Sequence, residues 1–276
     1  MDIPRIPVGK AIEASIDYLV EHFSFATKAF SAVLDTGLDI VEGAMHALPP
    51  WLFILLTGLL VWRLTKSRKI GIFSIAGLLL ILNMGLWKAT ISTISLVIVS
   101  TLMALLIGVP TGILAAMNKY VNKTVMPSLD VMQTMPAFVY LIPAIPFFGL
   151  GKVAAIFSTI IFAMPPAIRL TCLGINQVPK ELVECAEAFG SSRWQRLVKL
   201  ELPLALPTIM AGVNQTVMLA LSMVVIAAMI GAKGLGGEVW KAIQRLQMGN
   251  GFEAGIGIVI VAMIMDRVLQ KIGSKK

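Results

Sequence analysis

Apolar residues fill seven long uncharged runs in this chain of 276 residues. Because about 20 helical residues cross the hydrocarbon of a bilayer, the pattern predicts seven membrane-spanning helices. The last run is short, but Asp266, Arg267 and Lys271 at its end can extend their side chains to the membrane interface. The runs are residues 47–62, 70–87, 89–117, 131–151, 153–168, 202–232 and 254–265.

Composition supports a protein whose surface faces lipid. Hydrophobic residues make up 57% of the chain and charged residues 14%, and the mean hydropathy is +0.86. Soluble domains contain about 25% charged residues. We therefore predict an all-α integral membrane protein. Cytosolic Lys and Arg beside anionic lipid explain the net charge of +8 better than nucleic-acid binding does.

Two of the runs contain residues that disturb a straight helix. The third includes the segment 108–112, with two glycines and Pro110, which predicts a kink or a close helix approach. The fourth carries Pro136, Pro143 and Pro146 and cannot be one straight helix. Non-helical backbone survives within a membrane only where it is buried in protein or lines a cavity. The fourth run is therefore our candidate for the lining of a transport pathway.

Polar and aromatic side chains in the fourth and sixth runs are the candidate pathway residues. They are Gln133, Thr134, Met135, Pro136, Phe138 and Tyr140 in the fourth run, and Asn214, Gln215 and Ser222 in the sixth. An alternative is that the polar groups only join helices through hydrogen bonds, and that the aromatic rings face lipid or the core. The sequence leaves both interpretations open.

The segment 1–46 is predicted to form an amphipathic helix outside the membrane. Apolar residues recur at spacings of four and three from Ile12 to Ala44, and a break is expected near Gly37 or Gly43. Three basic and seven acidic residues give the segment a net charge of −4, which argues against adhesion to anionic lipid. We expect a scaffold helix that packs on its own protein; the alternative is a flexible acidic tail.

A polar stretch from Arg169 to Pro203 is expected to hold two short water-facing helices. Pro179 suits the first turn of the first helix, and Gly190 suits its left-handed stop. Ser192 and Gln195 have the spacing of a capping box for a second helix that ends at Pro203. Small side chains on the first helix would let another surface come close, so the stretch is interpreted as a docking element.

The residues of this stretch resemble a known signature. Glu184-Cys185-Ala186, Gly190, Leu200 and Leu202-Pro203 match E-A-A-x3-G-x9-I-x-L-P, the "EAA" signature of the membrane subunits of bacterial ABC importers, except at Cys185 and Leu200. Segments 132–140, 173–179, 211–215 and 219–226 are similar to the glycine betaine/proline branch. The resemblance covers residues 89–269.

The resemblance implies a type I ABC importer permease. Its permease domain would be residues 89–271, with a cytosolic coupling loop at 170–203, two peripheral helices at 47–88 and a tail at 272–276. The residues that would contact an ATPase are Glu184, Ala186, Gly190, Leu200 and Pro203. The expected partners are a second copy of the chain, two ATPase subunits and an external substrate-binding protein. Glycine betaine, proline betaine or a related quaternary ammonium solute would be the substrate.

Other transport functions remain open at this point. The alternatives are an importer of methionine, sulfonate or phosphonate, an osmotic channel, or a secondary transporter. The uncharged runs argue against the last, because ion-coupled carriers usually keep ionisable residues within the bilayer.

Charge indicates the orientation of the chain, and motif content argues against catalysis. With the polar stretch in the cytosol, 14 Lys and Arg lie inside and 8 outside, so the N-terminus is expected outside a bacterial cytoplasmic membrane and the C-terminus inside. We find no phosphate-binding loop, no nucleophile elbow and no metal-ligand set around His22 or His46. We therefore expect no enzyme, metal or cofactor in this chain; a partner ATPase would use ATP and Mg²⁺.

Overall fold

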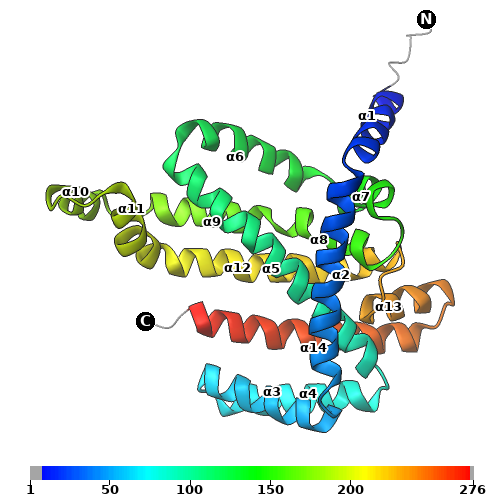
Figure 1. Ribbon diagram of the computed structural model, residues 1–276. Helices are drawn as coiled ribbons and strands as arrows, with labels where there is room; N and C mark the ends of the chain where they lie inside the picture. Colours follow the sequence, from blue (N-terminus) through cyan, green and yellow to red (C-terminus); the bar gives the residue numbers. More distant parts are fainter. Residues whose placement is uncertain (1–7, 274–276) are drawn as a thin grey trace, which may run out of the picture.

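The computed structural model describes residues 8–273, and over this range every regular element is helical (Figure 1). The helices in chain order are α1 (Val8–His22), α2 (Ser24–His46), α3 (Pro50–Thr65), α4 (Arg68–Asn83), α5 (Trp87–Met117), α6 (Lys119–Thr134), the 3₁₀-helix η1 (Ala137–Tyr140), α7 (Leu141–Phe148), α8 (Lys152–Ala163), α9 (Pro165–Asn176), α10 (Lys180–Ala188), α11 (Arg193–Arg196), the π-helix η2 (Leu197–Glu201), α12 (Leu202–Ala228), α13 (Leu235–Gln244) and α14 (Met248–Gly273). The expected all-α fold is confirmed.

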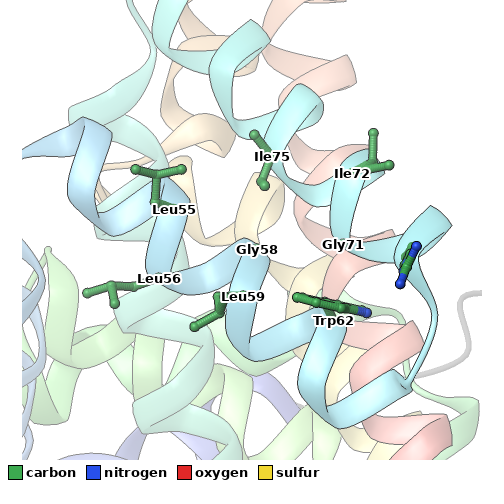
Figure 2. Close-up of a pocket in the computed structure, with 9 residues that line it drawn as sticks. Leu55, Leu56, Gly58, Leu59, Trp62, Gly71, Ile72 and Ile75 are labelled. Carbon is green, nitrogen blue, oxygen red and sulfur yellow. The ribbon is translucent and has the colours of Figure 1, made fainter.

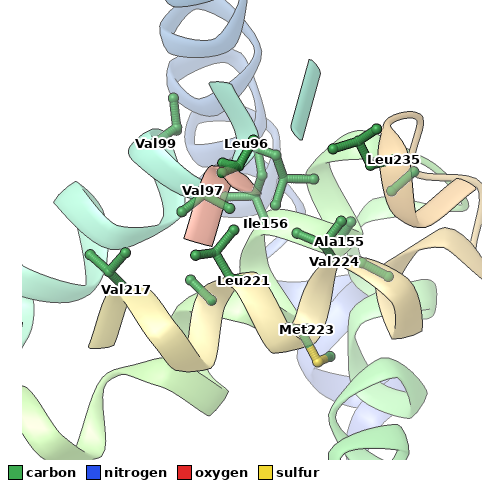
Figure 3. Close-up of a cluster of buried hydrophobic side chains, with 14 of the residues drawn as sticks. Leu96, Val97, Val99, Ala155, Ile156, Val217, Leu221, Met223, Val224 and Leu235 are labelled. Atoms are coloured by element: carbon green, nitrogen blue, oxygen red, sulfur yellow. The ribbon is translucent and has the colours of Figure 1, made fainter. Parts of the chain in front are cut away.

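The helices form a bundle in which α10 and the C-terminal end of α14 lie at one end and α13 lies at the other (Figure 1). The core lies where α5, α8 and α12 pack together, with α13 closing one end. Figure 3 shows this cluster, in which Leu96 and Val97 of α5 meet Ile156 of α8 and Leu221 of α12. Burial of these branched side chains fixes the relative positions of the long helices.

Three continuous helices in residues 8–273 are long and apolar enough to cross a membrane. They are Trp87–Met117, Lys152–Asn176 and Arg193–Ala228, with 31, 25 and 36 residues. Counting each bent helix pair as one span adds α2 with α3, bent by 99°, and α6 with η1 and α7, bent by 112°. Helices α3 and α4 have 16 residues each. The count of seven crossings therefore stays a prediction.

The two disturbed runs behave as their sequences predict. A Cβ atom added to Gly112 of α5 would lie 2.6 Å from the Ile168 carbonyl oxygen of α9, so the expected close approach is present. Gly108, one turn earlier, also faces α9. The fourth run is not a straight helix, because α6 ends at Thr134 and the chain turns at Pro136 into η1 and α7.

The N-terminal segment packs on its own protein but differs from the prediction in its break and its buried face. The helix is interrupted at Phe23 and continues through Gly37 and Gly43, so the expected break there is wrong. Leu34 and Leu38 are buried against the bundle, and Phe30 of the expected row packs on Phe148 and Phe157, whereas Val33 and Ile40 of that row are exposed. Helix α2 carries two apolar rows, and spacing alone does not distinguish which one meets protein.

Helix α2 runs across the bundle and is held there by polar contacts as well as by apolar ones (Figure 1). The Glu42 carboxylate accepts a hydrogen bond from Ser92 of α5 at 2.7 Å and pairs with Lys152 of α8 at 3.0 Å. Burial alone would raise the pKa of Glu42, but the hydrogen bonds from Ser92 and Lys152 and the nearby positive charge outweigh it and lower the pKa.

Candidate functional site

The first helix of the polar stretch, α10, ends in the left-handed turn that Gly190 predicts. Gly190 has a φ of +77°, and its N–H donates to the Glu187 carbonyl at 2.9 Å. The Ser191 N–H donates to the Ala186 carbonyl at 3.0 Å. These two bonds make a Schellman motif, which satisfies carbonyls at the helix end. An added Cβ at Gly190 would meet nothing within 4 Å, so glycine is required for the backbone conformation and not for space.

The predicted capping box is confirmed at the start of the second helix. The Gln195 N–H donates to the Ser192 Oγ at 3.3 Å, and the Ser192 N–H donates to the Gln195 Oε1 at 2.9 Å. This reciprocal pair satisfies two N–H groups that the first turn would leave without partners. The Schellman motif ends at Ser191 and the capping box begins at Ser192, so hydrogen bonds fix the turn between α10 and α11 on both sides.

The second helix was predicted to end at Pro203, but it continues past this residue. Helix α11 passes through η2 into α12, giving one helical stretch from Arg193 to Ala228. Within η2 the Leu202 N–H donates to the Leu197 carbonyl, five residues back. Proline lacks an N–H and clashes with the preceding turn, and a widened π turn directly before Pro203 is a known way to accommodate such a disturbance.

The water-facing loop is shorter than the expected range of 170–203. Helix α9 continues to Asn176, and Thr171, Cys172 and Ile175 on it are buried. Their packing against α5 and α12 outweighs the polar character of the local sequence. The exposed coupling segment therefore comprises residues 177–196, and we use this name for it below.

Arg196 fastens the coupling segment to the base of α12. Its guanidinium forms ion pairs with Glu187 of α10 and with Glu201, whose Oε1 lies 2.8 Å from the Arg196 Nε. The Nε–H does not point along that contact, so it is an ion pair without a directed hydrogen bond. Beneath it, Leu197 is 1% exposed and packs with Ile175 and Ala205. These contacts join the segment to the base of α12 and, through Leu197 and Ile175, to α9.

The predicted ATPase-contacting residues differ in exposure. Glu184, Gly190 and Pro203 are exposed, whereas Ala186 and Leu200 are half-buried. Two large side chains that our sequence reasoning missed are more prominent: Phe189 is 86% exposed and Trp194 is 68% exposed. The signal that could have found them is an aromatic residue in a charged stretch, where neither a core nor lipid explains it.

The candidate pathway residues of the fourth run gather around the bend after α6. Gln133, Thr134 and Pro136 are exposed, Met135 is half-buried, and Phe138 is 51% exposed. Tyr140 is buried: its hydroxyl donates to the Met132 carbonyl, and its ring packs edge-on against Phe162. The turn η1 also contacts α12, so the structure brings the fourth and sixth runs together.

The three candidates of the sixth run point to different surroundings on α12. Asn214 donates to the Asp266 carboxylate of α14 at 2.9 Å, which is a helix-joining contact. Gln215 and Ser222 are exposed and lie two turns apart, and the Ser222 hydroxyl donates to the Met218 carbonyl of its own helix. The structure therefore brings Gln215 and Ser222, but not Asn214, to an open face.

Comparison with known proteins identifies the family. The family model described as "Binding-protein-dependent transport system inner membrane component" matches residues 108–269, more than half of the chain. The chain is 49% identical to the glycine betaine/carnitine transport permease protein GbuB of Listeria monocytogenes, over 99% of this chain and 98% of that protein. It is 46% identical to the glycine betaine transport system permease protein OpuAB of Bacillus subtilis, over 99% and 97%.

A solved structure shares the fold at low sequence identity. The inward-facing MetNI methionine ABC transporter aligns with a TM-score of 0.59 and 23% identity, over 68% of this chain and 92% of that one. Together with the apolar helices and the exposed coupling segment, these similarities assign the molecule. The chain is a multi-pass membrane protein that belongs to the family of binding-protein-dependent transport system inner membrane components.

Proposed function

We propose that this chain is the permease subunit of an ATP-driven importer and that its coupling segment docks into a separate ATPase. The observation that carries the proposal is the coupling segment itself, which is exposed, bears Phe189 and Trp194, and is fixed to the base of α12 by Arg196. Exposed aromatic side chains on a rigid support are typical centres of binding energy at protein interfaces.

The continuous helical stretch from Arg193 to Ala228 suggests how force reaches the membrane. Closure of two ATPase subunits around ATP would move the coupling segment, and α12 would move with it, because α11, η2 and α12 form one continuous helical stretch. Two copies of the chain would form the pathway, and an external binding protein would deliver the solute. In this arrangement ATP and Mg²⁺ belong to the ATPase, and this chain supplies no catalytic group.

We propose glycine betaine or a related quaternary ammonium solute as the substrate class. The support is that relatives which this chain matches over nearly its whole length are glycine betaine transport permeases. Quaternary ammonium groups are bound by aromatic faces, and Phe138 is the most exposed aromatic residue near the bend after α6. The N-terminus would lie outside the bacterial cytoplasmic membrane, and the end of the bundle that carries the coupling segment would face the cytosol, as would the C-terminus.

Transport by the reconstituted complex tests this proposal. Vesicles containing the permease, its ATPase and its binding protein are loaded with ATP or left without it, and labelled glycine betaine uptake is measured. We expect uptake only with ATP, unchanged by an ionophore that removes ion gradients. Uptake without ATP, or loss of uptake with the ionophore, would favour a secondary transporter and contradict the proposal.

A further inference from the structure

Helices α3 and α4 form a hairpin with an apolar groove on its outer face (Figure 2). A Cβ added to Gly58 would lie 2.2 Å from a side-chain carbon of Ile75, and one added to Gly71 would lie 2.9 Å from the Trp62 Cβ, so the two glycines allow close packing. Figure 2 shows Leu55, Leu59 and Trp62 along α3 and Ile72 and Ile75 along α4, with the glycines between them. The groove has a volume of about 400 Å³.

The end of this groove that lies near the turn between α3 and α4 is strongly basic. Arg63, Lys66, Arg68 and Lys69 surround the turn, and all four are exposed. Lys66 itself adopts a φ of +53°, which reverses the chain within two residues and brings the four cations together. The sequence holds no Asp or Glu between Glu42 and Asp130, and none of the four forms an ion pair within residues 8–273.

One cation is positioned directly at the groove. The Arg68 guanidinium carbon lies 6.0 Å from the centre of the Trp62 ring, at the outer limit of a cation–π contact. Both side chains line the groove. Trp62 therefore forms a wall of the apolar channel and also holds a positive charge at its mouth.

We propose that this hairpin binds one anionic phospholipid of the cytosolic leaflet, with an acyl chain in the groove and the phosphate against Arg68 and Lys69. A long apolar channel that opens at a basic cluster matches the two parts of such a lipid. A second copy of the chain is a poorer occupant, because a two-fold contact at this face would set one basic turn against another. The inference uses the orientation given under the proposed function and needs neither its substrate nor its ATPase.

Lipid retention by the purified full-length chain tests the proposal. Native mass spectrometry measures retention of dioleoyl phosphatidylglycerol, with dioleoyl phosphatidylcholine and glycerol phosphate as comparison probes. We expect the phosphatidylglycerol dissociation constant to rise about fivefold for each cation removed in Arg68→Gln and Lys69→Gln. Ile72→Trp, which fills the groove and leaves every charge in place, is expected to weaken retention as well. Glycerol phosphate, which has no acyl chain, is expected not to bind measurably.

Lys119→Gln with Lys123→Gln is the matched control, because it removes two exposed cations from another turn at the same end of the bundle. This control is expected to retain phosphatidylglycerol as the unmodified chain does. An equal loss in the control would show that only overall charge matters and would overturn the proposal. Unchanged retention in Ile72→Trp, or equal binding of phosphatidylcholine, would overturn it too. All of these measurements are independent of transport.

Discussion

Glu42 of α2 and Lys152 at the start of α8 lie 110 residues apart in the sequence, and their side chains form an ion pair of 3.0 Å. The same carboxylate accepts the Ser92 hydroxyl of α5. One acidic residue thus ties the N-terminal helix to two helices of the bundle. Leu34 and Leu38, buried on the same helix, supply the apolar part of that contact.

The Glu42 contact predicts a pH dependence of the attachment of α2. The pKa of Glu42 is lowered in the folded chain, so its contribution to stability is present above the unfolded pKa of about 4.3 and is lost as the pH falls through the folded value. We expect Glu42→Gln to cost about 1 kcal/mol at pH 7 and to remove this part of the acid sensitivity. Limited proteolysis of α1 and α2 against pH measures the effect. Asp35→Asn, at an exposed position on the same helix, should leave the profile unchanged.

Substitution of Gly190 is expected to uncouple solute import from ATP hydrolysis. A β-branched residue is strained at a φ of +77°, whereas asparagine adopts this conformation readily, and neither side chain meets a neighbour. Gly190→Val is therefore expected to lower solute import per ATP hydrolysed at least tenfold while the subunit still inserts. Gly190→Asn should retain most of the import. If both variants import at the normal rate, the turn between α10 and α11 does not transmit the movement.

We expect Trp194 to lie at the centre of the ATPase interface. Truncating a central aromatic residue of an interface typically costs 2 kcal/mol or more, so we expect Trp194→Ala to weaken ATPase binding by about thirtyfold. A binding titration of the purified ATPase onto the solubilised permease measures this. Leu246→Ala is the control, since Leu246 is 85% exposed and follows α13, at the opposite end of the bundle. Equal binding by the Trp194→Ala variant and the unmodified chain would place the interface elsewhere.

A larger residue in place of Gly112 is expected to destabilise the packing of α5 against α9. A methyl group there would lie 2.6 Å from the Ile168 carbonyl oxygen and 2.7 Å from the Thr171 Cβ, and neither backbone nor a buried Cβ can move aside easily. Gly112→Ala is expected to cost about 1–3 kcal/mol in the thermal stability of the solubilised chain. Gly255→Ala on α14 meets nothing within 4 Å and should be neutral or slightly stabilising. Similar melting temperatures for the two variants would refute the close α5–α9 contact.

Local signals in the sequence predicted local structure well. The Gly190 turn and the pair of Ser192 and Gln195 depend on bonds between residues at most five apart in the chain, so their pattern is visible without the fold. The bend around Pro136 follows from the missing N–H groups of the prolines. Composition and run length were sufficient for the all-α membrane class.

The errors arose where distant contacts decide the outcome. Pro203 was expected to end a helix, but Leu197 and Ala205 on either side of it are buried against Ile175, and this packing favours a continuous helix. The buried face of α2 is selected by α5 and α8, and the exposed row would have fitted the spacing equally well. The contacts of Arg196 were not predicted, because Glu187 meets it only after α10 folds back and Glu201 comes within reach only through the π turn.

The π turn at Leu197–Glu201 is equivalent to one residue inserted into an α-helix. An α-helix has 3.6 residues per turn, and this turn holds one residue more, so Arg196 and Glu201 lie on the same face of the helix. Deleting Val198 would restore regular hydrogen bonding and place Arg196 four residues before Glu201, a spacing that keeps an ion pair on one face of an α-helix. The widened turn therefore accommodates one extra residue while the contact between Arg196 and the base of α12 is kept.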